Sequence, residues 1–280
     1  MLAALVFAAG FLCAQPSRVF ASSSLLDDPV EEPRTPPTLE ELENLPRINK
    51  VIDDKAGLPF DIRENAIREA ALSYGARGGL AWRTYHIRSE MERRAGSMDK
   101  VYDFRQLLIA APSGLLIEPP VISESINALI ITGKGTEAAV SDRIYDIIAN
   151  ARIVGAPRSW RNYLERDWGE VTEPPDLLRP VNESEREQWI KWVRKGWEEG
   201  ARQADDIFRD DLNELMADYQ GMVRYRMLLA QGIVTPPYAL QIDRGVTGGG
   251  DVLRVGDRAV QITGMPALIP GAERWQPANR

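Results

Sequence analysis

The stretch from Glu183 to Gln231 constrains the fold most, because its apolar side chains recur at helical spacing along its whole length. Charged side chains fill the opposite face, so the stretch predicts an amphipathic helix that follows Asn182. At about 1.5 Å per residue, one uninterrupted helix would be roughly 70 Å long. Because that length exceeds a compact domain, we expect a break near Gly200 or Gly221.

A second amphipathic helix is predicted from Asp61 toward Tyr85, where apolar residues again recur at helical spacing. Asp61 and Glu64 have the spacing of a capping box, in which side chains bond the free backbone N–H groups at a helix start. Three glycines interrupt the pattern: Gly75, Gly78 and Gly79. Each should weaken the helix by roughly 1 kcal/mol relative to alanine, so we expect them to serve close backbone packing. Gly96 predicts the end of the helix.

Between residues 99 and 176 the sequence predicts short elements. Val101–Leu108 fits a strand or a short helix, and Pro119–Ile122 must be extended because proline disfavours helix in the preceding residue. We expect a strand at Ala128–Ile131, with a turn at 133–135. The expected short helices are Asp142–Ala151 and Ser159–Arg166.

The C-terminal part predicts β structure. Val252–Val255 and Arg258–Thr263 flank Gly256–Asp257, and a glycine at the first position of a two-residue turn favours a β-hairpin. Gly245–Gly250 is expected to be a flexible loop before it. The predicted fold class is therefore α+β and mainly helical, with long amphipathic helices and a small antiparallel β element at the C-terminal end.

The N-terminal residues predict an export signal and a linker. Leu2–Leu12 is apolar but about half as long as a membrane-spanning helix, which is the length of a signal-peptide core. Cleavage is expected between Ala21 and Ser22, which would remove Cys13 with the signal peptide. The alternative is that Cys13 is a lipidation site, although Leu12 stands where a small residue is preferred. Thr38–Leu45 fits one short helix. The expected organisation is a signal peptide (1–21), a flexible acidic and proline-rich tether (22–60), one α+β domain (61–270) and a flexible tail (271–280).

Charge and composition exclude several function classes. With 34 Lys and Arg against 41 Asp and Glu, the net charge of -7 argues against direct nucleic-acid binding, which needs a basic face. One Cys and one His exclude zinc fingers and Cys/His nucleophile pairs. Ile131–Thr136 resembles a phosphate loop but lacks its first glycine, which argues against nucleotide binding. The known catalytic motifs are also missing, and we expect no cofactor, metal, catalytic set or small-molecule substrate.

Paired carboxylates leave one enzymatic alternative open. A glycosidase needs only two acids at a set separation, and such pairs occur at Glu64/Glu69 and Glu198/Glu199. Charged helix faces in contact with water explain these pairs better than catalysis does. His86 and Glu90 likewise fit an exposed helical pair better than a metal site.

Aromatic and arginine residues are the most informative side chains, because Trp, Tyr and Arg dominate protein–protein interfaces. Each ring fits either a core position with a polar rim or a subunit contact, and we expect at least one to lie in a subunit contact. The interface candidates are Trp82, Arg83, Tyr102, Phe104, Trp160, Arg161, Tyr163, Pro236, Pro237 and Tyr238.

The same segments resemble the DotC family of Dot/Icm (type IVB) secretion systems and its conjugation homologues. The motifs occur in the family's order from about residue 62 to 268, and the ordered series is more specific than any one motif. The motifs are Gly79–Arg83, Val101–Phe104, Pro119–Val121, Ser141–Tyr145, Trp160–Leu164, Gly196–Trp197, Gly200, Gly221–Met222, Tyr225–Arg226, Pro236–Tyr238, Gly245–Gly248 and Ile262–Thr263.

The resemblance implies a non-enzymatic, periplasm-facing lipoprotein of a ring-shaped outer-membrane core complex. Its implied partners are a DotD-like lipoprotein and a DotH-like channel component, which it helps to place at the outer membrane. The residues before Cys13 depart from the lipidation pattern of the family. The alternatives are a periplasmic peptidoglycan-acting hydrolase that uses paired carboxylates, and a solute-binding protein, against which the missing alternation of strands and helices argues.

Overall fold

The structure, a computed structural model, describes residues 35–46, 60–132, 137–271, 273 and 275. The expected signal peptide, the cleavage site Ala21–Ser22 and Cys13 lie outside these residues, as do the predicted turn at 133–135 and most of the tail. In the part of the chain that is described, no helix combines the length and the apolar character needed to cross a membrane.

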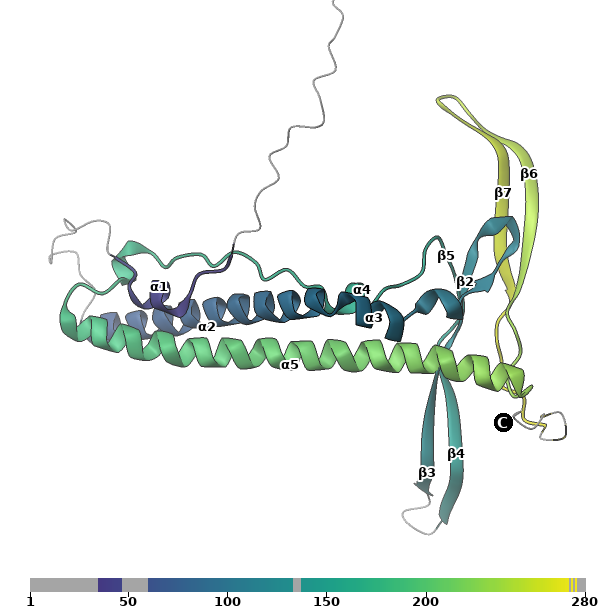
Figure 1. Ribbon diagram of the computed structural model, residues 1–280, viewed down its shortest axis with the longest axis horizontal. Coiled ribbons are helices and arrows are strands. Elements are labelled where there is room, and N and C mark those ends of the chain that lie inside the picture. Colours follow the sequence, from purple (N-terminus) through teal and green to yellow (C-terminus); the bar gives the residue numbers. More distant parts are fainter. Residues whose placement is uncertain (1–34, 47–59, 133–136, 272, 274, 276–280) are drawn as a thin grey trace, which may run out of the picture. The chain divides into compact units, whose positions relative to one another are not determined.

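Two long helices, α2 (Phe60–Arg93) and α5 (Glu183–Ala230), lie side by side and form the main body (Figure 1). The Asn182 side chain caps α5 by accepting a hydrogen bond of 2.9 Å from the Glu185 backbone N–H. The expected break in α5 is wrong, because the helix continues for 48 residues. Both glycines at which we expected it, Gly200 and Gly221, instead contact other elements, so packing along the helix compensates for their low helix propensity.

Glycines bring the backbones of the two helices into contact. A Cβ atom added to Gly75 or Gly79 would overlap the carbonyl oxygen of Val193 or Trp197 on α5. On the facing helix, Gly200 meets the carbonyl oxygen of Ala76 in the same way. The expected close packing is confirmed for Gly75 and Gly79. Gly96, in contrast, does not end α2 but lies in the next helix, α3 (Ala95–Val101).

Part of the predicted tether packs on the helices. Thr38 and Glu41 form a capping box at the start of α1 (Leu39–Glu43), within the expected short helix. Leu42 of this helix is fully buried, and the Trp189 indole N–H on α5 donates a hydrogen bond of 3.1 Å to its carbonyl oxygen. The apolar side chain and the indole partner therefore hold residues 35–46 against the body despite the acidic surroundings.

Short elements connect the two long helices. Within the described ranges, most buried apolar side chains lie in three clusters, centred on Trp189, on Trp160 and on Tyr225. Of the two alternatives for Val101–Leu108, the short helix is correct, since this stretch contains the 3-10 helix η2 (Phe104–Leu107). The helix expected at Ser159–Arg166 is the shorter α4 (Arg161–Leu164). Two further short helices are η3 (Pro112–Gly114) and η5 (Asp176–Leu178).

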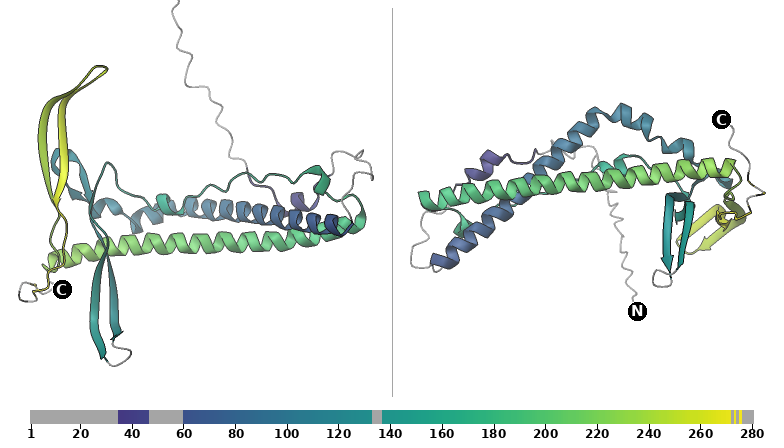
Figure 2. Two further views of the ribbon diagram at one scale, coloured as in Figure 1. Left: turned by 180° about the vertical axis from the view of Figure 1, so that it is seen from behind. Right: turned by 90° about the horizontal axis from the view of Figure 1, so that it is seen from below.

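Among the described residues, all β structure is antiparallel and forms three small sheets. The first sheet joins β1 (Ile109–Ala110), β2 (Leu116–Glu118) and β5 (Arg152–Val154). The other two are long hairpins, β3 (Val121–Thr132) with β4 (Glu137–Ala149), and β6 (Tyr238–Gly249) with β7 (Val252–Gly264) (Figure 2). The predicted α+β class and C-terminal β element are confirmed, while the hairpin β3–β4 was predicted only as a strand at Ala128–Ile131.

Three local predictions are wrong in the hairpins. Asp142–Ala151 is not a helix, because Tyr145 and Ile147 point toward the core around Tyr225 at strand spacing. The turn of the C-terminal hairpin is not Gly256–Asp257, and Gly245–Gly250 is not a loop. The positive φ angles of Gly245 (68°) and Gly256 (71°) instead occur at irregular points within the paired strands.

The buried hydroxyl of Tyr225 leads to a testable prediction about stability. Its hydroxyl is buried without a hydrogen-bond partner among the described residues, and burial raises its pKa to about 12. The Tyr225→Phe variant should therefore be more stable by about 1 kcal/mol in urea unfolding at pH 8, because an unsatisfied buried hydroxyl costs free energy. The unfolded chain loses this proton near pH 10 and the folded chain near pH 12, so the native protein loses stability as pH rises through that window.

The Tyr225→Phe variant has no hydroxyl to titrate. The difference in free energy of unfolding between this variant and the native protein should therefore increase between pH 9 and pH 11.5. A Tyr225→Phe variant that is less stable at pH 8 would show that the hydroxyl has a partner.

Candidate interaction surface

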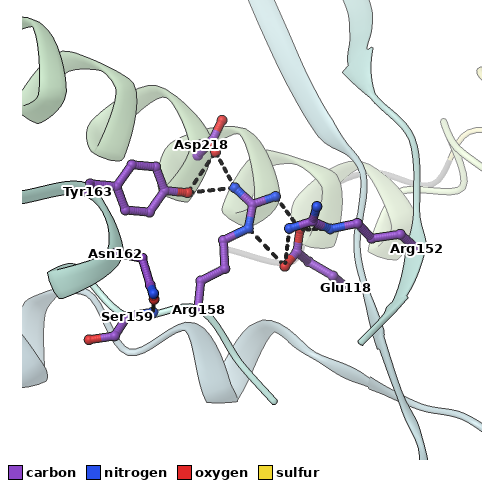
Figure 3. A network of polar contacts seen from close by, with 7 residues as sticks. All are labelled: Glu118, Arg152, Arg158, Ser159, Asn162, Tyr163 and Asp218. Atoms are coloured by element: carbon purple, nitrogen blue, oxygen red, sulfur yellow. Dashed lines mark hydrogen bonds and ion pairs between the residues drawn. The ribbon is translucent and has the colours of Figure 1, made fainter. Parts of the chain in front are cut away.

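Arg158, in the loop after β5, joins several elements near the root of the β3–β4 hairpin (Figure 3). Its Nε donates a hydrogen bond of 2.9 Å to Glu118 on β2, and its Nη1 donates one of 2.6 Å to the Tyr163 hydroxyl on α4. It also forms an ion pair with Asp218 on α5, and the Tyr163 hydroxyl donates to the same carboxylate at 2.7 Å. Arg152 on β5 donates a further bond of 3.0 Å to Glu118. These contacts tie β2, β5 and α4 to α5.

The centre of this network, around Glu118 and Arg158, is largely removed from water. Glu118 is only 3% exposed, so its charge depends on the two guanidinium groups. Although burial opposes the charged form of Arg158, hydrogen bonds to Glu118 and Tyr163 raise its pKa. Burial, followed by the hydrogen bond to Asp218, raises the pKa of Tyr163. The guanidinium therefore stays charged and the phenol stays neutral at physiological pH, which suits a permanent structural contact.

An open cavity of about 600 Å³ lies beside this network. The three arginines in its lining, Arg152, Arg158 and Arg166, all bind carboxylates of the chain itself. Arg166, for example, forms a 2.7 Å hydrogen bond from Nη2 to Asp211. The arrangement fits an anchor between elements better than a receptor for an anionic ligand.

The β3–β4 hairpin is also held directly by α5. Gly221 allows close approach, since an added Cβ would lie 3.1 Å from the backbone nitrogen of Ile122. Arg224 donates a hydrogen bond of 2.6 Å to the Ile122 carbonyl oxygen and one of 3.2 Å to Glu124. The first residues of β3 are thus rigidly attached, while the rest of the hairpin continues beyond this contact (Figure 1).

Exposed apolar side chains concentrate on the two long hairpins. Of nineteen exposed large apolar residues in the described part of the chain, four lie on β3–β4 and seven on β6–β7. They are Ile126, Leu129, Val140, Ile148, Tyr238, Leu240, Ile242, Val246, Val252, Leu253 and Val255. We call these eleven residues the hairpin surface. Apolar groups gathered on exposed strands are typical of a protein–protein contact.

The outer backbone edges of both hairpins are also open to pairing with another chain. Each hairpin is a sheet of only two strands among the described residues, so the outer edge of every strand is unpaired. Free edges of long strands are templates for pairing with another chain, and an isolated two-stranded sheet is at best marginally stable in water. The hairpin surface is therefore the best candidate for a binding site.

Several of the predicted interface residues make contacts within the chain. Phe104 and Trp160 are buried, Tyr163 belongs to the Arg158 network, and Arg161 stacks over the Trp160 ring at 4.3 Å. These residues belong to the core alternative that the sequence left open.

The remaining predicted residues divide between internal contacts and the surface. The Trp82 ring lies 5.7 Å from Trp197, and the Tyr102 ring 5.4 Å from Tyr219. Arg83 forms an ion pair of 2.7 Å with Asp205 across the two long helices. Around the start of β6, Pro236 and Tyr238 are exposed and Pro237 is half-buried. Of the predicted candidates, only Tyr238 joins the hairpin surface.

The other ten members of the hairpin surface were not predicted. Leu240 and Ile242 alternate with the polar residues Gln241 and Asp243, and this alternation could have identified them.

His86, considered for metal binding, and the carboxylates considered for glycosidase chemistry are exposed on the long helices. His86 is exposed, with its Nδ1 2.8 Å from the Trp82 carbonyl oxygen. The carboxylates of the two considered pairs, Glu64/Glu69 and Glu198/Glu199, are exposed on α2 and α5. Within the described ranges, no group of three or more His, Cys, Asp or Glu side chains could hold a metal ion.

Comparison with known families adds an independent finding. Residues 61–277 match the family model T4SS_TraI, described as "Type IV secretory system, conjugal DNA-protein transfer". A comparison with curated proteins found no match. The family match confirms the expected association with type IV secretion and conjugation, and it covers most of the chain, including the long helices and both hairpins. The chain therefore belongs to the T4SS_TraI family of type IV secretory system proteins for conjugal DNA-protein transfer.

Proposed function

We propose that this protein is a non-enzymatic structural subunit of the outer-membrane core complex of a type IVB secretion or conjugative transfer system. In this role it resembles DotC and helps to place the channel component at the outer membrane. The family match supports the association with type IV secretion, and the ordered DotC-like motifs support the finer assignment. The apolar segment Leu2–Leu12 supports export to the periplasm, where the core complex assembles.

The hairpin surface is the observation that carries this proposal. Eleven exposed large apolar residues on two-stranded hairpins would be a liability in a protein that works alone. In a scaffold subunit, the same residues are covered by neighbours, here a DotD-like lipoprotein and a DotH-like channel component. The anchor around Arg158 supports such a role, because it ties the elements at the hairpin root to the long helices.

Deletion of the gene tests the proposal directly. Conjugative transfer should be lost in the deletion strain and restored by the intact gene, and the protein should co-purify with the outer-membrane fraction and both partners. Normal transfer in the deletion strain would contradict the proposed function. A cleared band on a peptidoglycan zymogram that disappears in Glu64→Gln or Glu198→Gln variants would favour the hydrolase alternative instead.

A hairpin variant gives a sharper prediction. The double variant Leu240→Gln/Ile242→Gln should lower affinity for the core complex by about a hundredfold, because two apolar contacts of a few kcal/mol in total are lost. Transfer frequency should fall with it, whereas thermal stability should stay unchanged because both side chains are exposed in the single chain.

The matched control is Ile62→Gln on α2, since Ile62 is 54% exposed and Leu240 is 52% exposed. This control should transfer normally. Equal loss of transfer in both variants would show that the hairpin surface has no special role.

A further inference from the structure

The two long helices begin at the same end of the body, and a pocket of about 230 Å³ lies between their N-terminal parts (Figure 1). Ile67 on α2, which is 3% exposed, and the half-buried ring of Trp192 on α5 form its apolar wall. Gln188 and the α5 cap Asn182 add polar groups to the lining. Sites for drug-sized ligands are larger, roughly 300–1,000 Å³, so this pocket has the size for a single side chain of a partner.

Three cationic groups converge on the ring of Trp192. The Arg68 guanidinium carbon lies 5.8 Å from the ring centroid, and the ammonium nitrogens of Lys191 and Lys195 lie 5.2 Å and 5.4 Å from it. Each distance allows a cation–π contact, but like charges gathered around one ring repel one another. An anion bound among the three groups would turn this repulsion into attraction.

The carboxylates near the pocket do not pair with these three cations. Glu185 is bound by Arg63, whose Nε donates a hydrogen bond of 2.8 Å to it. Glu64 in the lining, and Glu187 and Glu199 at one helical turn from the two lysines, make no ion pair within the described part of the chain. The lining and the ring contacts together hold four cations and two carboxylates, so the pocket is positive in a chain of net charge -7.

The helix α1 shows how the same two long helices hold an acidic segment. Its Leu42 is fully buried in the cluster around Trp189, and its Glu43 accepts a hydrogen bond of 2.6 Å from the Nε of Arg194. The pocket beside Trp192 offers the same combination of an indole ring, a buried aliphatic side chain and cations.

We propose that this pocket binds an acidic segment of a partner protein. One aliphatic side chain of the segment would lie against Ile67 and Trp192, and flanking carboxylates would contact Arg68, Lys191 and Lys195. Charge complementarity favours such a partner, and the pocket favours a peptide over a membrane, because a flat layer of headgroups would contact the lysines and leave the pocket empty. The contact is separate from the hairpin surface, since the β3–β4 hairpin is held at Gly221, toward the other end of α5.

Peptide titration of the purified full-length protein tests the site. The probe is a fluorescently labelled synthetic peptide that carries one leucine between two pairs of glutamates, and fluorescence anisotropy measures its affinity. Lys191→Glu/Lys195→Glu should weaken binding at least tenfold, because two attractive contacts become repulsive. Exchange of the leucine of the peptide for serine should weaken binding about tenfold, because the apolar wall then receives a polar side chain.

Arg202→Glu/Arg226→Glu is the matched control, since it makes the same change of charge at two exposed positions of α5 outside the pocket. It should leave the affinity within about twofold, and circular dichroism shows whether both double variants are folded. Equal losses in the two double variants, equal affinity for the leucine and serine peptides, or no binding of the probe to the unaltered protein would overturn the inference.

Three further outcomes would overturn it in favour of another occupant. Binding to vesicles of phosphatidylglycerol and phosphatidylcholine that Lys191→Glu/Lys195→Glu abolishes, without peptide binding, would indicate a membrane surface. Self-association that the same variant abolishes would indicate a second copy of the chain. Peptide binding that is lost in Arg194→Glu but kept in the lysine variant would mean that the peptide displaces α1. Because purified protein is used, none of these results depends on whether deletion of the gene abolishes transfer.

Discussion

Gly79→Ala and Gly200→Ala are each expected to lower the free energy of unfolding by about 2–3 kcal/mol, although alanine is the better helix former. A Cβ at Gly79 would overlap the carbonyl oxygen of Trp197, and one at Gly200 would overlap that of Ala76. Backbone atoms cannot rotate away as a side chain can, so α2 and α5 must move apart. Separation weakens the packing of neighbouring side chains as well, and this loss exceeds the roughly 1 kcal/mol that helix propensity returns.

Gly96 on α3 provides the matched control. A Cβ there meets nothing within 4 Å, so Gly96→Ala should keep or slightly raise the stability of the protein. Urea unfolding followed by circular dichroism measures all three variants. If Gly79→Ala and Gly200→Ala behaved like Gly96→Ala, the two helices would not approach as closely as the structure shows.

The two helices could be predicted from sequence because their signal is local. Apolar residues at helical spacing identified α2 and α5, and the glycines of α2 were correctly connected with close packing. The continuity of α5 could not be predicted, since it depends on what faces Gly200 and Gly221. Those partners, Ala76 and Ile122, are far away in sequence.

The interaction surface was harder to predict because exposure is a property of the whole fold. Trp160 and Phe104 have the composition of interface residues, yet the chain buries both. The hairpin β3–β4 was missed because Asp142–Ala151 contains apolar residues at positions that fit a short helix as well as a strand. Pairing of Ile144 with Ser125 and of Ile147 with Ile122 decides between them, and pairing is not a local property.

Arg158→Met should be as destabilising as the glycine variants, by about 3 kcal/mol, because it removes one partner from a buried ion pair. Glu118 is 3% exposed and would retain only Arg152, whose side chain is largely in water. Tyr163 and Asp218 would keep their mutual hydrogen bond, so the main cost is the uncompensated charge of Glu118. Arg158→Lys should recover only part of the stability, since an ammonium group cannot bind Glu118, Tyr163 and Asp218 at once.

Arg209→Met is the control for this variant, because the Arg209–Asp206 pair on α5 is exposed on both sides. Its loss should change the free energy of unfolding by less than about 0.5 kcal/mol.

Hydrogen exchange then separates local from global effects of the Arg158→Met variant. If Arg158 anchors the hairpin, its loss should speed amide exchange at Val121 and Ile122 more than within α1, whose contacts are independent of the network. Uniformly faster exchange would instead mean that the network stabilises the fold without positioning the hairpin.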